Sequence, residues 1–365
     1  MYFWNKMREK LLIDAERLRY PNSGVANVAK SLIAGMQTLE TDLPYMVYGT
    51  PESLQEFPRL DVLSWQPWHR FLAPHTDQFA LVHVTHQLSS HFHSVGSHQK
   101  KVVTLHDLNF LHDQSSERKR KKSVRLVQKN IGNADAIVFI SNFAREDFHR
   151  NRHLFTTKKE VVEKVIYNGL MFPEQRKFRS DQLAYLLDRP FILNVGVLFP
   201  KKNQKVLLPL LVGNHKRLVM VASDAKEDYK GAFLHEAVQL GVADRLVFLE
   251  NISENDKYFL LQHCESLCHP SLAEGFGIPP VEAMFFGKPV FLSAKTSLPE
   301  IGGDAAFYFE DFQAETVVRN YQAGLEMYHS NPEAFSVAIK GHARKYSYLE
   351  MARNYADFYR QILAT

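Results

Sequence analysis

The sequence predicts an α/β protein made of two consecutive, doubly wound domains. Short runs rich in β-branched residues alternate with amphipathic helical stretches along the whole chain, which is the pattern of parallel α/β layers. A polar stretch at 172–189, with Pro173 and Pro190 at its edges, interrupts this alternation once, and the alternation then starts again. A chain of 365 residues is long enough for two domains that each bury a core of their own.

The first half carries the elements of one such domain. Apolar, β-branched runs predict strands at 11–15, 46–48, 80–84, 102–105, 136–140 and 165–167. Between several of these runs the apolar spacing changes to that of helices, which we expect to begin near Val25, Glu117 and Asn142.

The second half repeats the pattern. Here we expect strands at 191–195, 218–222, 246–249, 266–268, 290–292 and 306–309. In the last segment, 346–363, apolar and aromatic residues recur at intervals of three and four, which predicts an amphipathic helix. These residues are Tyr348, Ala352, Tyr355, Tyr359 and Ile362.

Composition favours an ordinary globular enzyme of the cytoplasm. With 45% hydrophobic and 23% charged residues the chain is typical of globular domains, and a net charge of +4 points to no particular partner. No apolar run approaches the length that spans a bilayer, and the first residues do not form a convincing signal peptide. The spacing of Cys264 and Cys268 matches no zinc or redox pattern, so we expect free thiols in a reducing compartment.

The most informative stretch is HPSLAEGFGIPPVEAM, at 269–284. It places two acids, Glu274 and Glu282, on either side of a glycine-rich loop that leads into a helix. Glycines without a Cβ let backbone N–H groups approach a ligand, and an anion in front of the helix meets the positive end of its dipole. If phosphates lie on the loop, the acids can accept hydrogen bonds from sugar hydroxyls. The stretch therefore indicates a nucleotide-sugar site.

Ordinary roles for these two acids stay open at this point. Glu282 can complement the helix dipole in the first turn, which is worth a few tenths to about 1 kcal/mol. Glu274 can be a solvated loop acid. The prolines at 279 and 280 suit first-turn positions in any helix.

Several polar residues follow predicted strands. His106 and Asp107 come after 102–105, Lys202 after 191–195, and Glu274 after 266–268, while Gly24 lies in the loop beyond the first strand. Doubly wound folds bind ligands outside the carboxyl ends of their strands. We therefore expect one cleft to collect these residues.

Linked segments in a fixed order carry a family resemblance. They are VVTLHDLNFL, ADAIVFISNFAREDF, VIYNG, ILNVGVLFPKKN, HPSLAEGFGIPPVEAMFFGKPV and SLPEIGGDAAFYF. With the loop PNSG at 21–24, the chain resembles the retaining glycosyltransferases of family 4 (group 1), which have the GT-B architecture. The resemblance implies two Rossmann-like domains facing a central cleft: an acceptor-side domain at 1–172, a linker at 173–189 and a donor-binding domain at 190–345. The terminal helix, 346–365, would cross back to the first domain.

The resemblance also implies roles for single residues of the second half. Glu282 matches the acid that holds the ribose hydroxyls of a nucleotide-sugar donor, and Glu274 matches the acid that contacts the transferred sugar. Lys202 matches the basic residue that pairs with the diphosphate, and Lys201 occupies the neighbouring basic position. Three loop residues would line the sugar and its phosphates: Gly275, Phe276 and Gly277.

Two residues of the first half complete the set. Gly24 matches a loop that closes over the phosphates, and His106 matches a residue near the reacting face of the sugar. His106, Glu274 and Lys202 are thus the catalytic candidates. A structural, hydrogen-bonding role for His106 is the alternative.

Some positions depart from the family pattern. Val197 follows Gly196 where many relatives carry an arginine, so Lys202 carries more of the phosphate charge. The tripeptide after Gly24, the stretch at 222–224 and the pair at 250–251 also differ from the common glycine patterns. These changes leave the class intact and leave the nucleotide open.

The expected chemistry replaces a sugar–phosphate bond by a sugar–acceptor bond, and no cofactor is required. Lys202 and the helix after Gly277 suit the negative charge that grows on the leaving diphosphate. No Asp-x-Asp pair follows a predicted strand, so we expect protein donors rather than a metal ion. The family implies retention of configuration, and we favour front-face attack in which the leaving phosphate takes the acceptor's proton. On this hypothesis Glu274 orients the sugar and is not a nucleophile.

A dense group of histidines invites a metal site: His83, His86, His91, His93 and His98. Imidazole is a common metal ligand, but no acid or cysteine recurs beside this group at ligand spacing. We therefore expect no metal here.

A basic run at 118–122, followed by Arg125, lies on a predicted helix. One reading is a solvated helix face. The other is contact with an anionic membrane surface, helped by the aromatic and basic tip that contains Phe3, Trp4 and Lys6. Such contact would place the protein peripherally on the inner face of the cytoplasmic membrane. No recognition module accompanies the run, which argues against nucleic acid.

The sequence therefore predicts a hexosyltransferase that extends a glycan or lipid-linked acceptor in bacterial surface-polysaccharide assembly, that is, of O-antigen, lipopolysaccharide or capsule. We favour GDP-mannose over a UDP-sugar as the donor. Two alternatives stay open: the same donor site with a small soluble acceptor, and a sugar-binding subunit without catalysis.

Overall fold

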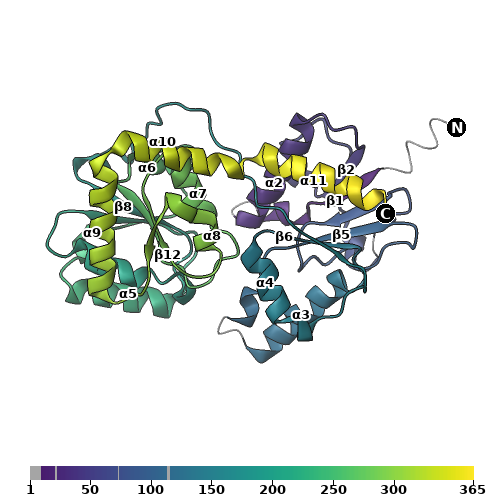
Figure 1. The fold of residues 1–365 in the computed structure, drawn as a ribbon, viewed down its shortest axis with the longest axis horizontal. Coiled ribbons are helices and arrows are strands. Elements are labelled where there is room, and N and C mark those ends of the chain that lie inside the picture. The colour runs from purple at the N-terminus through teal and green to yellow at the C-terminus, as the bar shows by residue number, and fades with distance from the viewer. Residues whose placement is uncertain (1–9, 21–22, 73, 113–115) are drawn as a thin grey trace. The chain divides into compact units, whose positions relative to one another are not determined.

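The computed structural model describes residues 10–20, 23–72, 74–112 and 116–365. Contacts divide the chain into two compact units. The first unit comprises Met1–Met171 and Tyr346–Thr365, and the second comprises Phe172–Lys345. Figure 1 shows each unit as a central sheet covered by helices.

The first unit is built on a seven-stranded sheet in the order β3-β2-β1-β4-β5-β6-β7, and every strand pair in it is parallel. The strands are β1 (Leu11–Asp14), β2 (Tyr45–Gly49), β3 (Val62–Ser64), β4 (Leu81–Val84), β5 (Lys100–Leu105), β6 (Ala136–Phe139) and β7 (Val162–Val165). The longer helices are α2 (Gly24–Thr38), α3 (Glu117–Ile131), α4 (Asn142–Arg150) and α11 (Tyr348–Leu363). Because β1, β4 and β6 are buried on both faces, their sequences are almost wholly apolar.

The terminal helix α11 belongs to this first unit. Its apolar side buries Met351, Tyr355, Tyr359 and Ile362 in the core formed with α2 and the sheet. Tyr359 Oη lies 2.7 Å from His83 Nδ1, and Tyr355 Oη lies 2.9 Å from Thr104 Oγ1. The expected return of the chain to its first domain is confirmed (Figure 1).

The second unit repeats the plan with a six-stranded parallel sheet in the order β10-β9-β8-β11-β12-β13. The strands are β8 (Phe191–Val195), β9 (Arg217–Val221), β10 (Leu246–Leu249), β11 (Ser266–His269), β12 (Val290–Ser293) and β13 (Phe307–Phe309). The helices are α5 (Glu227–Gln239), α6 (Glu254–His263), α7 (Ile278–Phe285), α8 (Leu298–Gly302), α9 (Ala314–Ser330) and α10 (Pro332–Ala343). A 3-10 helix, Gln204–Leu211, contributes four buried leucines to the core.

Two strands of the first unit differ from the sequence prediction. The edge strand β3 was not predicted, because it has only three residues and all three are half-buried. The edge strand β7 spans Val162–Val165 rather than 165–167, and it was missed because two charged residues, Glu163 and Lys164, form the middle of its sequence VEKV.

The polar segment expected as a linker is packed into the second unit. Within it Phe178, Leu183 and Leu186 are buried, and a 3-10 helix spans Ala184–Asp188. The Phe178 amide donates to Gln262 Oε1 over 2.9 Å, which ties the segment to α6.

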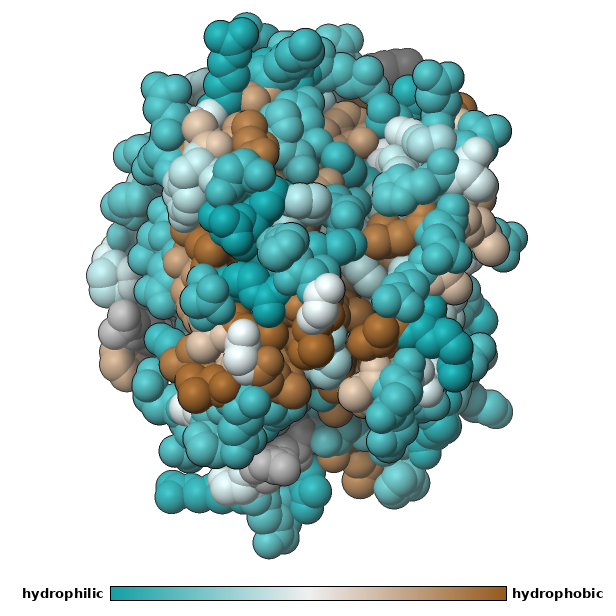
Figure 2. All heavy atoms as spheres, turned by 90° about the vertical axis from the view of Figure 1, so that its left-hand side faces the viewer, coloured by the Kyte–Doolittle hydropathy of each residue, from teal (hydrophilic) through white to brown (hydrophobic). Residues whose placement is uncertain are grey.

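Apolar side chains gather on one face of the second unit, amid a mostly hydrophilic surface (Figure 2). Exposed apolar residues of this unit include Leu234 and Val238, which follow one another at i and i+4 on α5, and Met327 on α9. Within the described residues, no helix combines the length and the apolar character that crossing a membrane requires.

Candidate active site

The second unit changes direction between β8 and β11. The chain runs outward from β8 through β9 to β10, and then continues from β11 on the other side of β8. Such a switch point leaves a crevice outside the carboxyl ends of the two strands, where doubly wound folds bind ligands. Lys202 ends a short helix after β8 (Pro200–Lys202), and Glu274 lies in the loop after β11, so the two residues flank this point.

Three side chains meet there. The Lys202 ammonium forms an ion pair with Glu274 Oε1, and His269 Nε2 donates to the same oxygen over 2.7 Å. The side chains of Lys202 and Glu274 are 16% and 14% exposed, and that of His269 is 2% exposed. Burial by itself would raise the pKa of Glu274, but Lys202 and His269 outweigh it and hold this pKa well below its usual range. Glu274 is therefore a carboxylate at neutral pH, so the solvated-acid interpretation does not apply.

The loop around Glu274 is held by its neighbours. Thr296 Oγ1 accepts from the Glu274 amide over 3.2 Å, and Ser297 Oγ donates to the carbonyl oxygens of Glu274 and Phe276 over 3.0 and 3.2 Å. On the other side the Leu272 amide donates to the Lys201 carbonyl over 2.7 Å. Since the loop is tied at both ends, Glu274 is placed before any ligand arrives.

Gly277 provides the entry into α7. Its φ is +108°, and a Cβ there would lie 2.8 Å from Leu298 Cδ2, so only glycine fits without a shift. Pro279 and Pro280 begin the helix and carry no N–H group, so an anion at this end relies on Ile278, the preceding loop amides and the helix dipole. Glu282 lies one turn further on, outside the first turn, where the dipole effect is weak.

Glu282 has a partner that the sequence analysis did not name. Lys257 Nζ, on α6, lies 2.7 Å from Glu282 Oε1, and the two side chains are 18% and 14% exposed. Burial would lower the pKa of Lys257, but the Glu282 carboxylate outweighs it and raises this pKa. Both acids of the sequence stretch first singled out, Glu274 and Glu282, are thus paired with a lysine.

The first unit has its own switch point, between β1 and β4. Gly24 is the first residue of α2, whose N-cap Ser23 accepts from the Ala26 amide over 3.2 Å. The first two residues of the PNSG loop, and the N-terminal tip with Phe3, Trp4 and Lys6, lie outside the described residues.

His106 follows β5 and is buried. Its Nε2 donates to the Thr85 carbonyl over 2.9 Å, and its ring stacks on His86 at 5.1 Å between ring centroids. The Gln87 amide group joins the loops after β4 and β5, since it accepts from the His106 amide and donates to the Asp107 carbonyl. Burial lowers the pKa of His106 to about 4, so its ring is neutral at pH 7.

Four of the five histidines considered as metal ligands form separate ring hydrogen bonds, and Nδ1 of the fifth, His91, is buried without one. His83 lies between Thr104 Oγ1 and Tyr359 Oη, His93 contacts Asn130, and His98 contacts the Asp77 carbonyl. Across the described ranges, no three histidine, cysteine or acidic side chains come together in a way that could hold a metal ion.

Sequence reasoning missed two residues of the site. His269 begins the conspicuous stretch, but its place at the end of β11, facing the loop that follows, becomes visible only in the fold. Lys257 gives no sequence signal, because it lies 25 positions before its partner on a separate helix.

Comparison with known proteins agrees with this fold. Residues 175–341, most of the second unit, match the family model of the glycosyl transferases group 1. The O-antigen chain mannosyltransferase B of Escherichia coli is 22% identical over 87% of this chain and 91% of its own length. The mannosyltransferase WbdA of Escherichia coli is 28% identical over 58% of this chain, but the match covers only 26% of WbdA.

A solved structure of HepE from Anabaena, in complex with UDP-glucose, aligns with 96% of this chain and 99% of its own, with a TM-score of 0.71 at 20% identity. This likeness establishes the fold: two Rossmann-like parallel sheets of the GT-B type. The family match thus lies in the second unit, where residues 175–341 resemble the group 1 glycosyltransferases.

Proposed function

We propose that this protein is a retaining, metal-independent hexosyltransferase that builds bacterial surface polysaccharide, with a nucleotide-diphosphate sugar as donor and a glycan or lipid-linked acceptor. The observation that carries the proposal is the buried cluster of Lys202, Glu274 and His269 at the switch point of a group 1 glycosyltransferase domain. A cation and a carboxylate fixed side by side suit a ligand that carries a diphosphate next to a hydroxyl-rich sugar.

For the donor we favour GDP-mannose over a UDP-sugar. Two relatives, mannosyltransferase B and WbdA, are named for mannose transfer, and the name of the first also contains the O-antigen chain. HepE, a structural neighbour at 20% identity, was solved with UDP-glucose and supports only the fold.

In the proposed reaction each pair has its own task. Glu282 accepts hydrogen bonds from the ribose hydroxyls, and Glu274 accepts from hydroxyls of the transferred sugar. Lys202 lies beside Glu274 and stabilises the negative charge that grows on the leaving diphosphate, together with Lys201 and the amino end of α7. Gly275, Phe276 and Gly277 line the sugar and phosphates, while Gly24 and His106 contribute from the first unit. His106 is neutral at pH 7, so it acts through hydrogen bonds.

In this proposal the anomeric configuration is retained because the acceptor attacks the sugar on the face from which the diphosphate leaves. The acceptor oxygen bonds to the anomeric carbon, the sugar–phosphate bond breaks, and the departing phosphate oxygen takes the acceptor's proton. Glu274 stays a carboxylate and forms no covalent bond to the sugar in this proposal, and its Oε1 contacts Lys202 and His269. Mass spectrometry after incubation with donor tests this step: a glycosyl adduct on Glu274 contradicts it.

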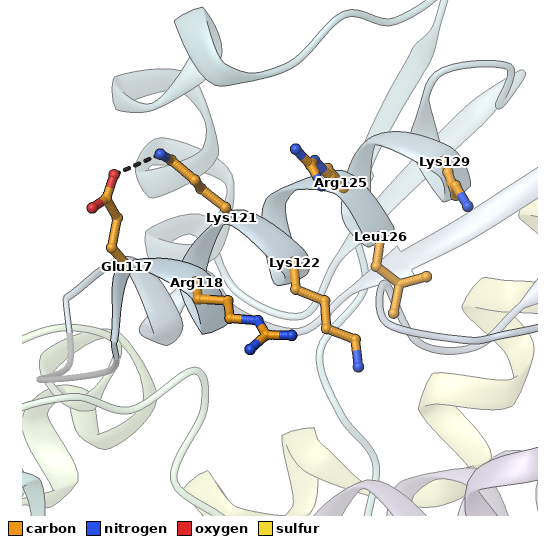
Figure 3. A pocket seen from close by; sticks show the side chains of 7 residues that line it. All are labelled: Glu117, Arg118, Lys121, Lys122, Arg125, Leu126 and Lys129. Atoms are coloured by element: carbon orange, nitrogen blue, oxygen red, sulfur yellow. Dashed lines mark ion pairs between the residues drawn. The ribbon is translucent and has the colours of Figure 1, made fainter.

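The basic side of α3 supports a membrane-bound acceptor. Its cations from Arg118 to Lys129 are exposed, and the ion pair drawn in Figure 3 joins Lys121 to Glu117. Arg118 and Lys122 extend together on one side of the helix, and the side chains enclose a shallow cavity of about 620 Å³ (Figure 3). Each such residue near the surface of an anionic bilayer strengthens binding by about 1 kcal/mol.

A thermal-shift series with GDP, UDP, GDP-mannose and UDP-glucose tests the donor class, since a ligand that binds the folded state raises its stability with the logarithm of saturation. Transfer to lipid-linked and to soluble acceptors, with and without EDTA, then tests the acceptor and metal independence. Stabilisation by nucleotides without any turnover would favour the sugar-binding subunit. Turnover that survives alanine at both Lys202 and Glu282 would mean that the site lies elsewhere.

A further inference from the structure

A second cavity lies in the second unit, at the carboxyl end of α7. Its volume is about 500 Å³, within the range of small-molecule sites. The segment before β8 and the helices α6, α7, α9 and α10 contribute its walls. The loop with Glu274 precedes the amino end of α7, and a helix of eight residues is about 12 Å long. The cavity and the Lys202–Glu274 pair therefore lie at opposite ends of this helix.

Four cations line this cavity: Arg176, Lys177, Lys288 and Lys340. Among the described residues that line it there is no aspartate or glutamate, and within the described ranges none of the four cations forms an ion pair. Elsewhere in the unit, half-buried lysines such as Lys202, Lys216 and Lys257 each have a carboxylate partner. The four charges of the cavity are thus not compensated by carboxylates, and the Arg176 guanidinium lies over the Phe178 ring at 5.0 Å from its centroid.

Helix dipoles do not account for these charges. Lys288 follows α7, and Lys340 lies in the last turn of α10, so each meets the negative end of a helix. A helix end carries about half an elementary charge, so α7 and α10 together offset about one of the four positive charges. Arg176 and Lys177 lie on a segment without a helix of its own.

Aromatic rings form the rest of the wall. Phe285, Phe286 and Tyr328 line the cavity, and Phe285 stacks on Phe172 at 4.4 Å between ring centroids. Tyr328 Oη donates to the Gly287 carbonyl over 3.1 Å, so its ring is fixed. These rings offer flat apolar surface beside the charges.

Packing holds the backbone beside the cations in place. Gly287 has a φ of +71°, and a Cβ there would lie 2.1 Å from Ser336 Oγ and 2.8 Å from Lys340 Cε, so α10 lies directly on this turn. Gln262 Nε2 donates to the Arg176 carbonyl over 2.9 Å and fixes the opposite wall. The cavity is thus bounded by anchored backbone on both sides.

We propose that this cavity is a second ligand site, for a small phosphorylated compound with a ring, such as a nucleoside diphosphate or a sugar phosphate. The phosphate groups pair with the four cations, and the ring lies on the aromatic wall. The site is separate from the donor site and does not depend on the function proposed above.

Binding stoichiometry of the full chain tests the proposal. Isothermal titration calorimetry is carried out with inorganic pyrophosphate, GDP, UDP and mannose 1-phosphate. Pyrophosphate carries charge without a ring, so comparison with the other probes separates recognition of the charge from recognition of the ring. The cavity variant is Lys288→Gln with Lys340→Gln, and the donor-site variant is Lys202→Ala. The matched control is Arg179→Gln with Arg319→Gln, which removes two exposed charges of the same unit outside the cavity. Unchanged unfolding midpoints establish that each variant is folded.

We expect at least one of the ring-bearing probes to bind twice per chain, and the affinity of the second site to fall about tenfold or more in the cavity variant but not in the control. Each substitution removes one charge-assisted contact with the phosphate. A loss of about 1.4 kcal/mol of binding free energy corresponds to a tenfold weaker affinity. The proposal is overturned if no probe occupies a second site, or if the cavity variant binds like the control. If Lys202→Ala still binds a probe at two sites, the proposed donor site is wrong. The cavity variant then still tests the second site.

Discussion

The Lys257 ammonium lies 2.7 Å from Glu282 Oε1, in a pair that joins α6 to α7. Both side chains are largely buried, so each charge depends on the other for compensation. If Glu282 receives the ribose of a donor, Lys257 sets where its carboxylate points. The pair is then part of the donor site without touching the reacting atoms.

Removing only the cation should be harmful. In Lys257→Met a largely buried carboxylate loses its partner, and we expect the free energy of unfolding to fall by about 1–3 kcal/mol. In Lys257→Met with Glu282→Gln most of that stability should return, while nucleotide affinity stays low. Urea unfolding and titration with GDP and UDP measure the two effects. Equal stability of the single and double variants would contradict the pairing.

The two neighbouring lysines should differ in their effect on turnover. Lys202→Ala removes the charge beside Glu274, and we expect kcat to fall by about 10²–10³, as for other groups that stabilise a developing anion. Lys201→Ala keeps the backbone carbonyl that accepts from Leu272, so its loss should be well under tenfold. Steady-state kinetics with a donor in excess compare them, and equal losses would refute the distinct role of Lys202.

Gly277→Ala should destabilise the entry to α7. The new Cβ meets Leu298 at 2.8 Å in a left-handed backbone, and we expect a loss of about 1–2 kcal/mol together with weaker donor binding. Gly231→Ala is the control, because it lies inside α5 with open space around its Cβ and should stabilise by up to about 1 kcal/mol. Thermal unfolding measures the change in stability of both variants, and we expect the two changes to have opposite signs.

Stability should fall in mild acid, in part through His83. Burial, and to a smaller extent the nearby His106, lowers the pKa of His83 to about 3, whereas an exposed histidine titrates at 6.5. The unfolded chain therefore binds a proton that the folded chain excludes, and stability is full above pH 6.5 and is lost as the pH falls toward 3. Between pH 7.5 and 5 this one group should remove about 2 kcal/mol.

The variant His83→Gln keeps a side chain that can bond to Thr104 and Tyr359 but cannot titrate. Its unfolding free energy should decline less than that of the unsubstituted protein over the same pH range, by about 2 kcal/mol. Parallel declines would show that His83 does not exclude its proton.

Binding to anionic vesicles should depend on α3. Replacing Arg118, Lys122 and Arg125 by glutamine removes three exposed charges, and at about 1 kcal/mol each we expect binding to vesicles with phosphatidylserine to weaken about 100-fold. The control replaces Arg59, Lys159 and Lys164, three exposed basic residues elsewhere in the first unit. Vesicle sedimentation compares them; equal loss, or no binding by any form, contradicts a specific membrane face.

Sequence patterns were sufficient for the buried strands and insufficient at the edges of the first sheet. Strands such as Phe191–Val195 and Val290–Ser293 lie where their apolar runs predict them, because central parallel strands are buried on both faces. Strands β3 and β7 lie at the edges and mix polar with apolar residues, so they carry a weaker signal.

The site shows the same limit. Spacing along one loop linked Glu274 to Glu282, and the order of motifs linked both to Lys202. The partners of these acids could not be predicted, because His269 and Lys257 reach them through the packing of β11 and α6. The neutral state of His106 likewise depends on its burial beside His86.

The place of α11 in the first unit has a consequence for biosynthesis. The core that contains Leu11 and Val102 also contains Tyr355 and Tyr359, which leave the ribosome only after the whole of Phe172–Lys345 has been made. At about 5–20 residues per second this interval lasts roughly 10 to 35 s. When that interval ends, the second unit has every strand it needs, while the first sheet still lacks the helix α11 that covers part of it. The part of the chain that is translated first is therefore completed last.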